Sequence, residues 1–208
     1  MIDIAARLAA EFAALPLKPD DAATAPQKKA YSEALSNAVA RALAAGLHGR
    51  GLDHTRPAPP GQLDRSGAER RMSGGIGAKK VDVTWATEES GLLLGISIKS
   101  INFRDSRSNN FQKNLTNRRG DMLFEAVTLH RRFPYAVLGG LFFLNEAAAN
   151  DGTGKRKSTF LNTHARLRLF TGRFDPAGRE EQYEHLFVVL HGAGPSGDTL
   201  KGLRSGGA

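Results

Sequence analysis

Two stretches of alternating apolar and polar residues, separated by a short polar segment, constrain the fold of this 208-residue chain more than any other feature. Residues 81–85 alternate in this way, and residues 92–99 repeat the same period of two. Such alternation is typical of β-strands that bury one face, and residues 87–91 have the composition of a turn. The sequence therefore predicts a β-hairpin near the middle of the chain.

Helical periodicity and apolar runs place further elements on either side of this hairpin. The predicted helices cover residues 2–15, 26–46, about 111–132 and 158–169, and the predicted strands cover residues 135–144 and 184–191. The resulting order, α-α-β-β-α-β-α-β, predicts an α/β fold in which a mixed sheet is flanked by helices. The length is that of one domain, so we expect a single unit over residues 1–208.

Two segments lack any such pattern. Residues 47–77 are rich in Gly, Pro and Arg, and they are predicted to form a long basic loop. This loop either lies along a phosphate backbone or is disordered. Residues 192–208 are rich in glycine, and they are predicted to form a flexible tail.

The charge of the chain favours a polyanionic partner. Lys and Arg number 29 against 21 Asp and Glu, which gives a net charge of +8. Residues 99–132 hold eight basic and three acidic side chains, so most of the excess lies in one segment. Nucleic acid is the first expectation and an anionic membrane the second, while a merely soluble basic protein is the alternative.

Composition excludes several classes of protein. The chain has no cysteine, which excludes disulfides, thiol catalysis and zinc sites built from cysteine. A reduced, cytoplasmic location is therefore expected. No apolar run reaches the roughly 20 residues that cross a bilayer, so no membrane-spanning segment is expected. Of the two polyanions, nucleic acid is taken as the partner, and no membrane is.

The hairpin brings an acid and a lysine to one face of the sheet. A turn at residues 89–90 places Asp82 opposite Ser97, and a turn at residues 90–91 places it opposite Lys99. Both registers keep the three side chains on one face, because a shift of two residues preserves the side. A carboxylate can hold Mg²⁺, and an ammonium group can stabilise charge or orient a metal-bound water. A solvent-facing Asp–Lys pair is the alternative.

These residues resemble the PD-(D/E)xK nuclease superfamily, which includes type II restriction endonucleases. The shared pattern is an Asp on one strand, a tripeptide ending in Lys on the next strand, and a following helix. The resemblance covers roughly residues 28–145. It departs at Val81, where the family has Pro, and at Ser97, where the family has a second acid. Either the site is inactive, or another acid has replaced the missing one.

The helix after the hairpin supplies a candidate for that acid. Some restriction enzymes of this superfamily carry Ser-x-Lys and take the acid from the next helix, in the pattern S-x-K…R-x6-E. Arg118 is followed by Glu125 at this spacing. The two lie within about 20° of each other on a helical wheel, and Glu125 lies about 40° from the apolar stripe, so it can reach Lys99. A salt bridge from Glu125 to Arg118 or Arg131 is the alternative.

The resemblance also points to residues outside this centre. Many nucleases of the superfamily have a metal-binding glutamate on the helix before the hairpin, and Glu33 matches that position; a plain surface role is the alternative. Residues around and after Lys99 are expected to contact DNA, because arginine reads guanine and asparagine reads adenine through paired hydrogen bonds. The expected substrate-binding residues are Ser97, Asn102, Arg104, Arg107, Lys113, Arg118 and Arg119.

The leading expectation is a Mg²⁺-dependent DNA endonuclease with the restriction-endonuclease-like fold, with Mn²⁺ as an alternative cofactor. The resemblance implies that Asp82 and Glu125 bind the metal, that Lys99 orients or activates the attacking water, and that Arg118 steadies the phosphate or Glu125. It also implies a role in restriction or anti-phage defence.

One such domain cuts one strand, so a homodimer or a defence-system partner protein is expected. A catalytically inactive nucleic-acid-binding module with the same fold is the second hypothesis, and Ser97 is its strongest indication. A third is an interaction subunit whose basic face meets an acidic protein.

Overall fold

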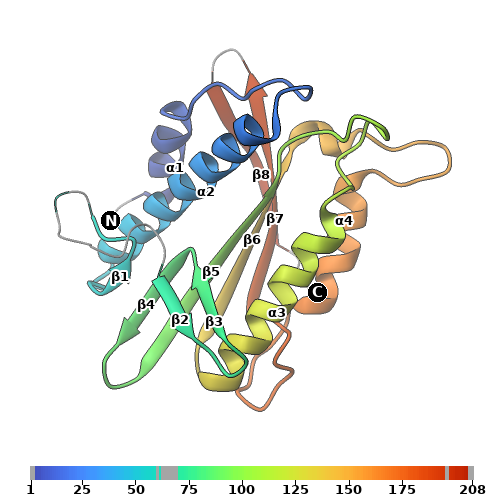
Figure 1. Ribbon diagram of the computed structural model, residues 1–208. Coiled ribbons are helices and arrows are strands. Elements are labelled where there is room, and N and C mark those ends of the chain that lie inside the picture. The colour runs from blue at the N-terminus through green and yellow to red at the C-terminus, as the bar shows by residue number, and fades with distance from the viewer. Residues whose placement is uncertain (1–2, 60, 62–69, 195–196, 206–208) are drawn as a thin grey trace.

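A six-stranded mixed sheet forms the centre of the computed structural model, and helices cover both of its faces (Figure 1). The structure describes residues 3–59, 61, 70–194 and 197–205. The strands lie in the order β1-β4-β5-β6-β7-β8, in which β5, β6 and β7 are parallel and the other neighbours are antiparallel. This confirms the predicted α/β class and the mixed sheet flanked by helices.

The bounds of the elements agree with the sequence pattern over most of the chain. The helices are α1 (Ile4–Ala13), α2 (Ala25–His48), α3 (Leu115–Arg132) and α4 (Thr159–Leu167), with the 3-10 turns η1 (Glu146–Ala149) and η2 (Arg168–Phe170). The sheet consists of β1 (Thr55–Arg56), β4 (Val83–Thr87), β5 (Gly91–Ile101), β6 (Val137–Asn145), β7 (His185–Gly194) and β8 (Gly197–Ser205). Two further strands, β2 (Arg70–Ser73) and β3 (Ala78–Val81), pair with each other as a separate ribbon.

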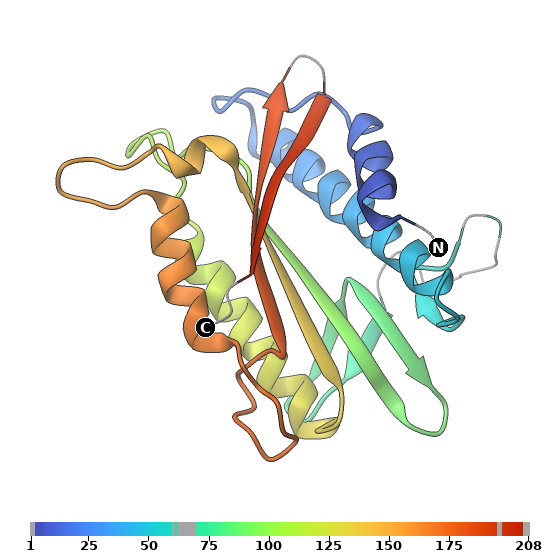
Figure 2. The same ribbon diagram turned by 180° about the vertical axis from the view of Figure 1, so that it is seen from behind.

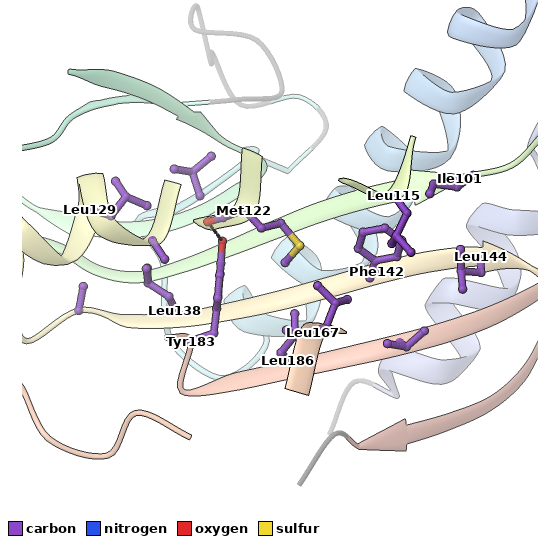
Figure 3. Packing of buried hydrophobic residues seen from close by; sticks show 14 of the residues in the cluster. Ile101, Leu115, Met122, Leu129, Leu138, Phe142, Leu144, Leu167, Tyr183 and Leu186 are labelled. Carbon is purple, nitrogen blue, oxygen red and sulfur yellow. Dashed lines mark hydrogen bonds between the residues drawn. The ribbon is translucent and has the colours of Figure 1, made fainter. Parts of the chain in front are cut away.

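The sheet is buried on both faces, which explains why β6 reads as a continuous apolar run. Helices α1 and α2 lie on one face, and α3 and α4 lie on the other (Figures 1 and 2). Leu35 of α2 belongs to the core that packs on Phe143 of the sheet. On the opposite face, Met122 of α3 packs with Leu138 and Phe142 of β6 (Figure 3). The two cores together fix α2 and α3 against the same central strands.

The hairpin has one of the two predicted registers over its inner part. Val83 pairs with Ile96, which is the register that sets Asp82 level with Ser97. Nearer the turn, Ala86 pairs with Leu92, so a β-bulge interrupts the ladder after Trp85. A bulge adds one residue to one strand and reverses its side-chain faces.

The first strand of the hairpin is not continuous, and this expectation was wrong. The chain bends at Asp82, between β3 and β4. As a result, Val81 packs in the core under α3, whereas Val83 packs in the core under α2. The alternation predicted one buried face, but both faces of this sheet are covered.

The prediction of a long loop over residues 47–77 was wrong in part. Helix α2 continues to His48, residues 55–56 form β1 at the sheet edge, and residues 70–73 form β2. Strands of two and four residues are too short to show a period. The remaining part of this segment, residues 60 and 62–69, lies outside the described residues.

The predicted flexible tail over residues 192–208 was also wrong in its larger part. Strand β7 continues to Gly194, and residues 197–205 form β8, which pairs with β7 in antiparallel fashion. Backbone hydrogen bonds to an open strand edge do not require apolar side chains, so composition gave no signal. Residues 195–196 and 206–208 lie outside the described part.

The β2–β3 ribbon is attached to α3 through glycine. The backbone N–H of Gly75 donates to the carbonyl oxygen of Thr128 at 2.8 Å. A Cβ on Gly74 would lie 2.4 Å from that same oxygen, so the close approach requires glycine. This contact holds α3, which carries Glu125, against the ribbon that leads into Asp82.

Within the described ranges, no helix combines the length and the apolar composition that a membrane crossing requires.

Candidate functional site

Lys99 lies between two carboxylates that come from different parts of the fold. Its Nζ is 3.3 Å from Oε2 of Glu125 on α3 and 4.0 Å from Oδ2 of Asp82 at the bend. All three side chains are largely buried. The structure thus brings together the three residues that the sequence singled out as catalytic.

Asp82 is fixed by the backbone of the neighbouring strand. Its Oδ2 accepts a hydrogen bond from the N–H of Ile98 at 2.6 Å. Ile98 precedes Lys99 on β5, so this bond holds the carboxylate beside the lysine. The bend at Asp82 therefore replaces regular strand pairing with a side-chain contact.

Glu125 contacts the sheet as the helical wheel predicted. The residue is only 4% exposed, and its carboxylate accepts a hydrogen bond from Lys99. Arg118 instead pairs with the acid three residues further along α3, and Arg131 pairs with an acid outside the helix. Glu125 is thus bound to Lys99, not to either arginine that was its alternative partner.

The charge state of Lys99 follows from these contacts. Burial lowers the pKa of Lys99, but the nearby carboxylates of Glu125 and Asp82 outweigh burial and raise it above 10.5. Lys99 is therefore an ammonium group that balances two carboxylates.

A cleft of about 800 Å³ opens between α2 and the segment that follows β5. Asp82 and Lys99 line it. Its other lining residues include several with charged side chains, from α2, from the loop after β5 and from the start of α3: Lys28, Lys29, Glu33, Arg104, Asp105, Lys113 and Arg118. Since basic residues outnumber acids there, the cleft suits an anionic molecule.

Glu33 lies in this cleft but not in the Asp82–Lys99–Glu125 centre. Its side chain is 63% exposed and pairs with Lys29 at 3.6 Å. Among the residues that the structure describes, no group of three His, Cys, Asp or Glu side chains is arranged to hold a metal. The carboxylates within contact distance of Lys99 in this centre are those of Asp82 and Glu125.

Ser97 and Asn102, which were expected to contact a substrate, are both largely buried, although Asn102 also lines the cleft. Ser97 is 1% exposed, on the strand face that α3 covers. Asn102 is 2% exposed, and its amide bonds to His191 and to Ser32, each at 3.0 Å. The hydroxyl of Ser97 is thus enclosed by protein, and the amide of Asn102 is held by neighbouring side chains.

The five basic residues expected to bind substrate have different surroundings. Arg104, Lys113 and Arg118 line the cleft, and Arg107 lines a neighbouring hollow. Lys113 is paired with Asp105 at 2.7 Å. Arg119 lines neither of these two hollows and lies over the ring of Phe170.

Tyr183 is a residue of the site that the sequence did not reveal. Its hydroxyl donates to the carbonyl oxygen of Met122 at 2.9 Å, one turn before Glu125 on α3 (Figure 3). Burial raises the pKa of Tyr183 well above 10, the charges of Glu125 and Asp82 raise it further, and the Ser97 hydroxyl opposes them. A single tyrosine before the last predicted strand carries no signal of this position.

Two cleft residues were also missed, Lys28 and Lys29 on α2. The signal for them was weak, because the first 49 residues hold equal numbers of acids and bases. The packing of α2 against the sheet places both lysines at the wall of the cleft.

Comparisons of the chain with protein-family models, with curated proteins and with solved structures find no match. Its function is therefore inferred from the chemistry of the site.

Proposed function

We propose that this chain is a metal-dependent DNA endonuclease that hydrolyses phosphodiester bonds. The observation that carries the proposal is the contact of one lysine, Lys99, with two buried carboxylates from separate elements at the wall of a basic cleft. Burying three charged groups is costly unless they compensate one another, and such groups cluster at functional sites.

The donor set fits Mg²⁺, with Mn²⁺ as an alternative. Mg²⁺ is usually held by one or two carboxylates, with waters and substrate phosphates completing its coordination. Asp82 and Glu125 would supply the two carboxylates, and Glu33 is a further acid in the same cleft. The ion would polarise the phosphate and acidify a bound water.

The chain's own residues then have distinct tasks. If Asp82 and Glu125 held a cation, its charge would compensate the two carboxylates, and the ammonium group of Lys99 would be free to orient water or to stabilise charge on the phosphate. Lys28, Arg104 and Arg118 line the cleft around it, and they suit contacts to the phosphate backbone.

The family resemblance supports further parts of the proposal. It suggests a role in restriction or anti-phage defence, cleavage as a homodimer or with a partner protein, and a cytoplasmic location. The shared pattern of Asp82, Lys99 and a helical acid supports membership of the PD-(D/E)xK superfamily in its Ser-x-Lys form.

The second candidate is a nucleic-acid-binding module of the same fold without cleavage. The observation that favours it is the burial of Ser97, at the place where the family has an acid. In that case the basic cleft binds DNA, and the Asp82–Lys99–Glu125 group is a structural ion-pair network.

Cleavage of supercoiled plasmid with Mg²⁺ or Mn²⁺ separates the two. The nuclease proposal expects the wild type to nick or linearise the plasmid and Asp82→Ala, Lys99→Ala and Glu125→Ala to fail while still binding it. If Glu125→Ala still cuts while the other two variants fail, another acid supplies the second ligand. The double variant Glu125→Ala/Glu33→Gln then tests Glu33, because loss of cleavage in it would identify Glu33 as that ligand. A wild type that retards the plasmid on a gel but never cuts it favours the binding module.

A further inference from the structure

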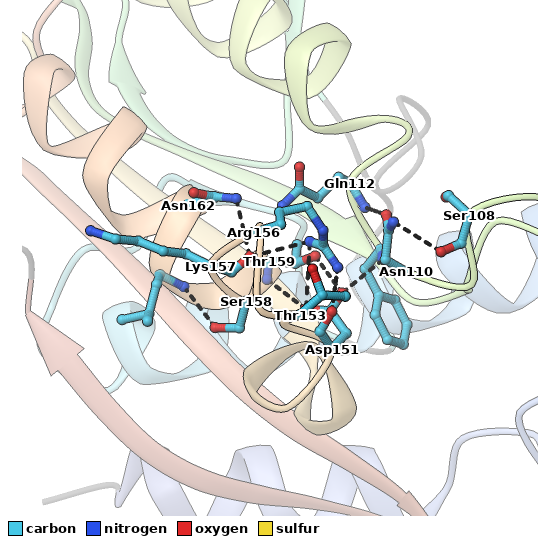
Figure 4. Close-up of polar contacts among 12 residues, drawn as sticks. Ser108, Asn110, Gln112, Asp151, Thr153, Arg156, Lys157, Ser158, Thr159 and Asn162 are labelled. Atoms are coloured by element: carbon cyan, nitrogen blue, oxygen red, sulfur yellow. Dashed lines mark hydrogen bonds and ion pairs between the residues drawn. The ribbon is translucent and has the colours of Figure 1, made fainter.

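Asp151, which follows η1, is a buried carboxylate outside the Asp82–Lys99–Glu125 centre. Its side chain is fully enclosed, with Oδ2 accepting from the N–H of Phe111 at 3.1 Å and Oδ1 from the N–H of Thr159 at 2.6 Å. The hydroxyl of Thr159 donates to it as well, and Arg156 donates to its backbone carbonyl (Figure 4). Asp151 therefore joins the loop before α3 to the start of α4.

The carboxylate stays ionised in this position. Burial raises the pKa of Asp151, but hydrogen bonds from Thr159 and Phe111 and the charge of Arg156 outweigh burial and hold it below its usual value. A buried anion with this many partners is a rigid anchor.

The anchor positions residues 152–157, which we name the basic turn. Thr153 and Arg156 exchange two backbone hydrogen bonds, at 2.8 and 3.1 Å, which close the turn. Arg156 is directed inward to Asp151, while Lys155 and Lys157 are exposed. Within the described part of the chain, neither lysine forms an ion pair.

The basic turn continues a surface that begins at the catalytic cleft. A second hollow, of about 690 Å³, adjoins the cleft, because Asp105, Ser106 and Lys113 line both. Arg107 lines the second hollow and is exposed. The loop that carries these residues and the basic turn lie side by side in both views, joined through Asp151 (Figures 1, 2 and 4).

We propose that the basic turn is a second phosphate-contacting element, which binds the DNA backbone beyond the cleft through Lys155 and Lys157. The inference deepens the proposed function and rests on its DNA substrate. Exposed lysine side chains are typical contacts to the phosphate backbone. Their continuity with the cleft favours DNA over an acidic protein.

The first test measures affinity without cleavage, with a fluorescent duplex of about three helical turns in EDTA, at several salt concentrations. Lys155→Ala/Lys157→Ala is expected to weaken binding and to reduce the slope of log K against log salt by about 1 to 2, because each phosphate contact contributes about 0.9. The control Arg131→Ala/Arg132→Ala removes the same charge at the other end of α3, about 24 Å along the helix from Leu115 at its start. This control is expected to leave the slope of log K against log salt unchanged.

The second test separates position from charge. Asp151→Asn makes the protein more positive, so attraction by net charge alone predicts unchanged or tighter binding. The anchored turn predicts weaker binding, because the lysines are kept but lose their fixed place. Lys155 and Lys157 are exposed, so the double lysine variant is expected to fold and tests the proposal even if Asp151→Asn does not fold.

The outcomes distinguish this inference from the proposed function. Equal losses in the lysine double variant and in its control, or no loss in either, overturn the inference. A lysine-dependent affinity for poly-glutamate equal to that for the duplex overturns it in favour of an acidic protein. A wild type that binds through these lysines but does not cut plasmid with Mg²⁺ contradicts the nuclease proposal and leaves the basic turn supported.

Discussion

Lys99 is the side chain whose replacement is most informative. In Lys99→Met, Asp82 and Glu125 face each other without a cation, so we expect a loss of about 3 kcal/mol in the free energy of unfolding. If the two carboxylates hold a metal, Mg²⁺ raises the melting temperature of this variant more than that of the wild type. Thermal unfolding with and without Mg²⁺ measures both effects.

Lys113→Met is the matched control, because Lys113 is exposed and its partner Asp105 lies outside the centre. Its stability is expected to change by less than about 1 kcal/mol, with no extra gain from Mg²⁺. If Lys99→Met is as stable as the wild type and Mg²⁺ does not raise its melting temperature, the two carboxylates are not coupled through the lysine.

His191 gives the fold a pH dependence of defined sign. Burial lowers the pKa of His191 to about 4; Lys18 contributes in the same direction and Glu146 opposes it. The unfolded value is near 6.5, so between pH 6.5 and 4 the unfolded chain binds more protons than the folded one. The contribution is fully present above pH 6.5 and falls as the pH falls.

Between pH 7 and pH 4.5 the free energy of unfolding of the wild type is therefore expected to fall by about 2 to 3 kcal/mol more than that of His191→Gln. Urea unfolding at a series of pH values measures this difference. The exposed His185→Gln is the control and is expected to follow the wild type. A His191→Gln curve parallel to that of the wild type contradicts the assigned pKa.

The convergence of Asp82, Lys99 and Glu125 was predictable at the residue scale. Side chains alternate between the two faces of a strand, and they follow a fixed angular step around a helix. The burial of Ser97 and Asn102 was not predictable. The alternation along a strand assigns a side chain to one face of the sheet, but it does not indicate whether another element covers that face. Here the residues that cover Ser97 come from α3 and from the segment around Tyr183, which are distant in sequence.

At the scale of elements, the long periodic helices and strands were predicted and the short or irregular ones were not. Helix α3 and strand β6 show clear patterns, whereas β1 and β2 are too short to do so. The bend at Asp82 breaks a regular alternation for a reason visible only in three dimensions, namely the hydrogen bond from the N–H of Ile98.

The attachment of the β2–β3 ribbon to α3 is testable with one added methyl group. Gly74→Ala places a Cβ 2.4 Å from the carbonyl oxygen of Thr128, so we expect a loss of about 1 to 3 kcal/mol in the free energy of unfolding. Gly77→Ala, in the same turn, meets nothing within 4 Å and is expected to stay within about 0.5 kcal/mol of the wild type. Equal stabilities in chemical denaturation would contradict this docking.

At the scale of the whole molecule, the sequence predicted the class of fold and the excess of positive charge, but not how the charge is arranged. Residues 99–132 hold most of the excess, yet the cleft they line also includes Lys28 of α2, and the basic turn is tied to the loop before α3. These segments meet only because α2 packs on the sheet and because Asp151 joins two distant loops. Long-range contacts of this kind leave no local sequence pattern.

We propose that Asp82 and Glu125 together bind one divalent cation. Titration calorimetry of Mn²⁺ into the wild type and into Asp82→Asn, Glu125→Gln and Glu33→Gln, without DNA, tests it most directly. We predict one site in the wild type that both Asp82→Asn and Glu125→Gln lose and Glu33→Gln keeps. Binding that survives Asp82→Asn and Glu125→Gln unchanged would contradict the account.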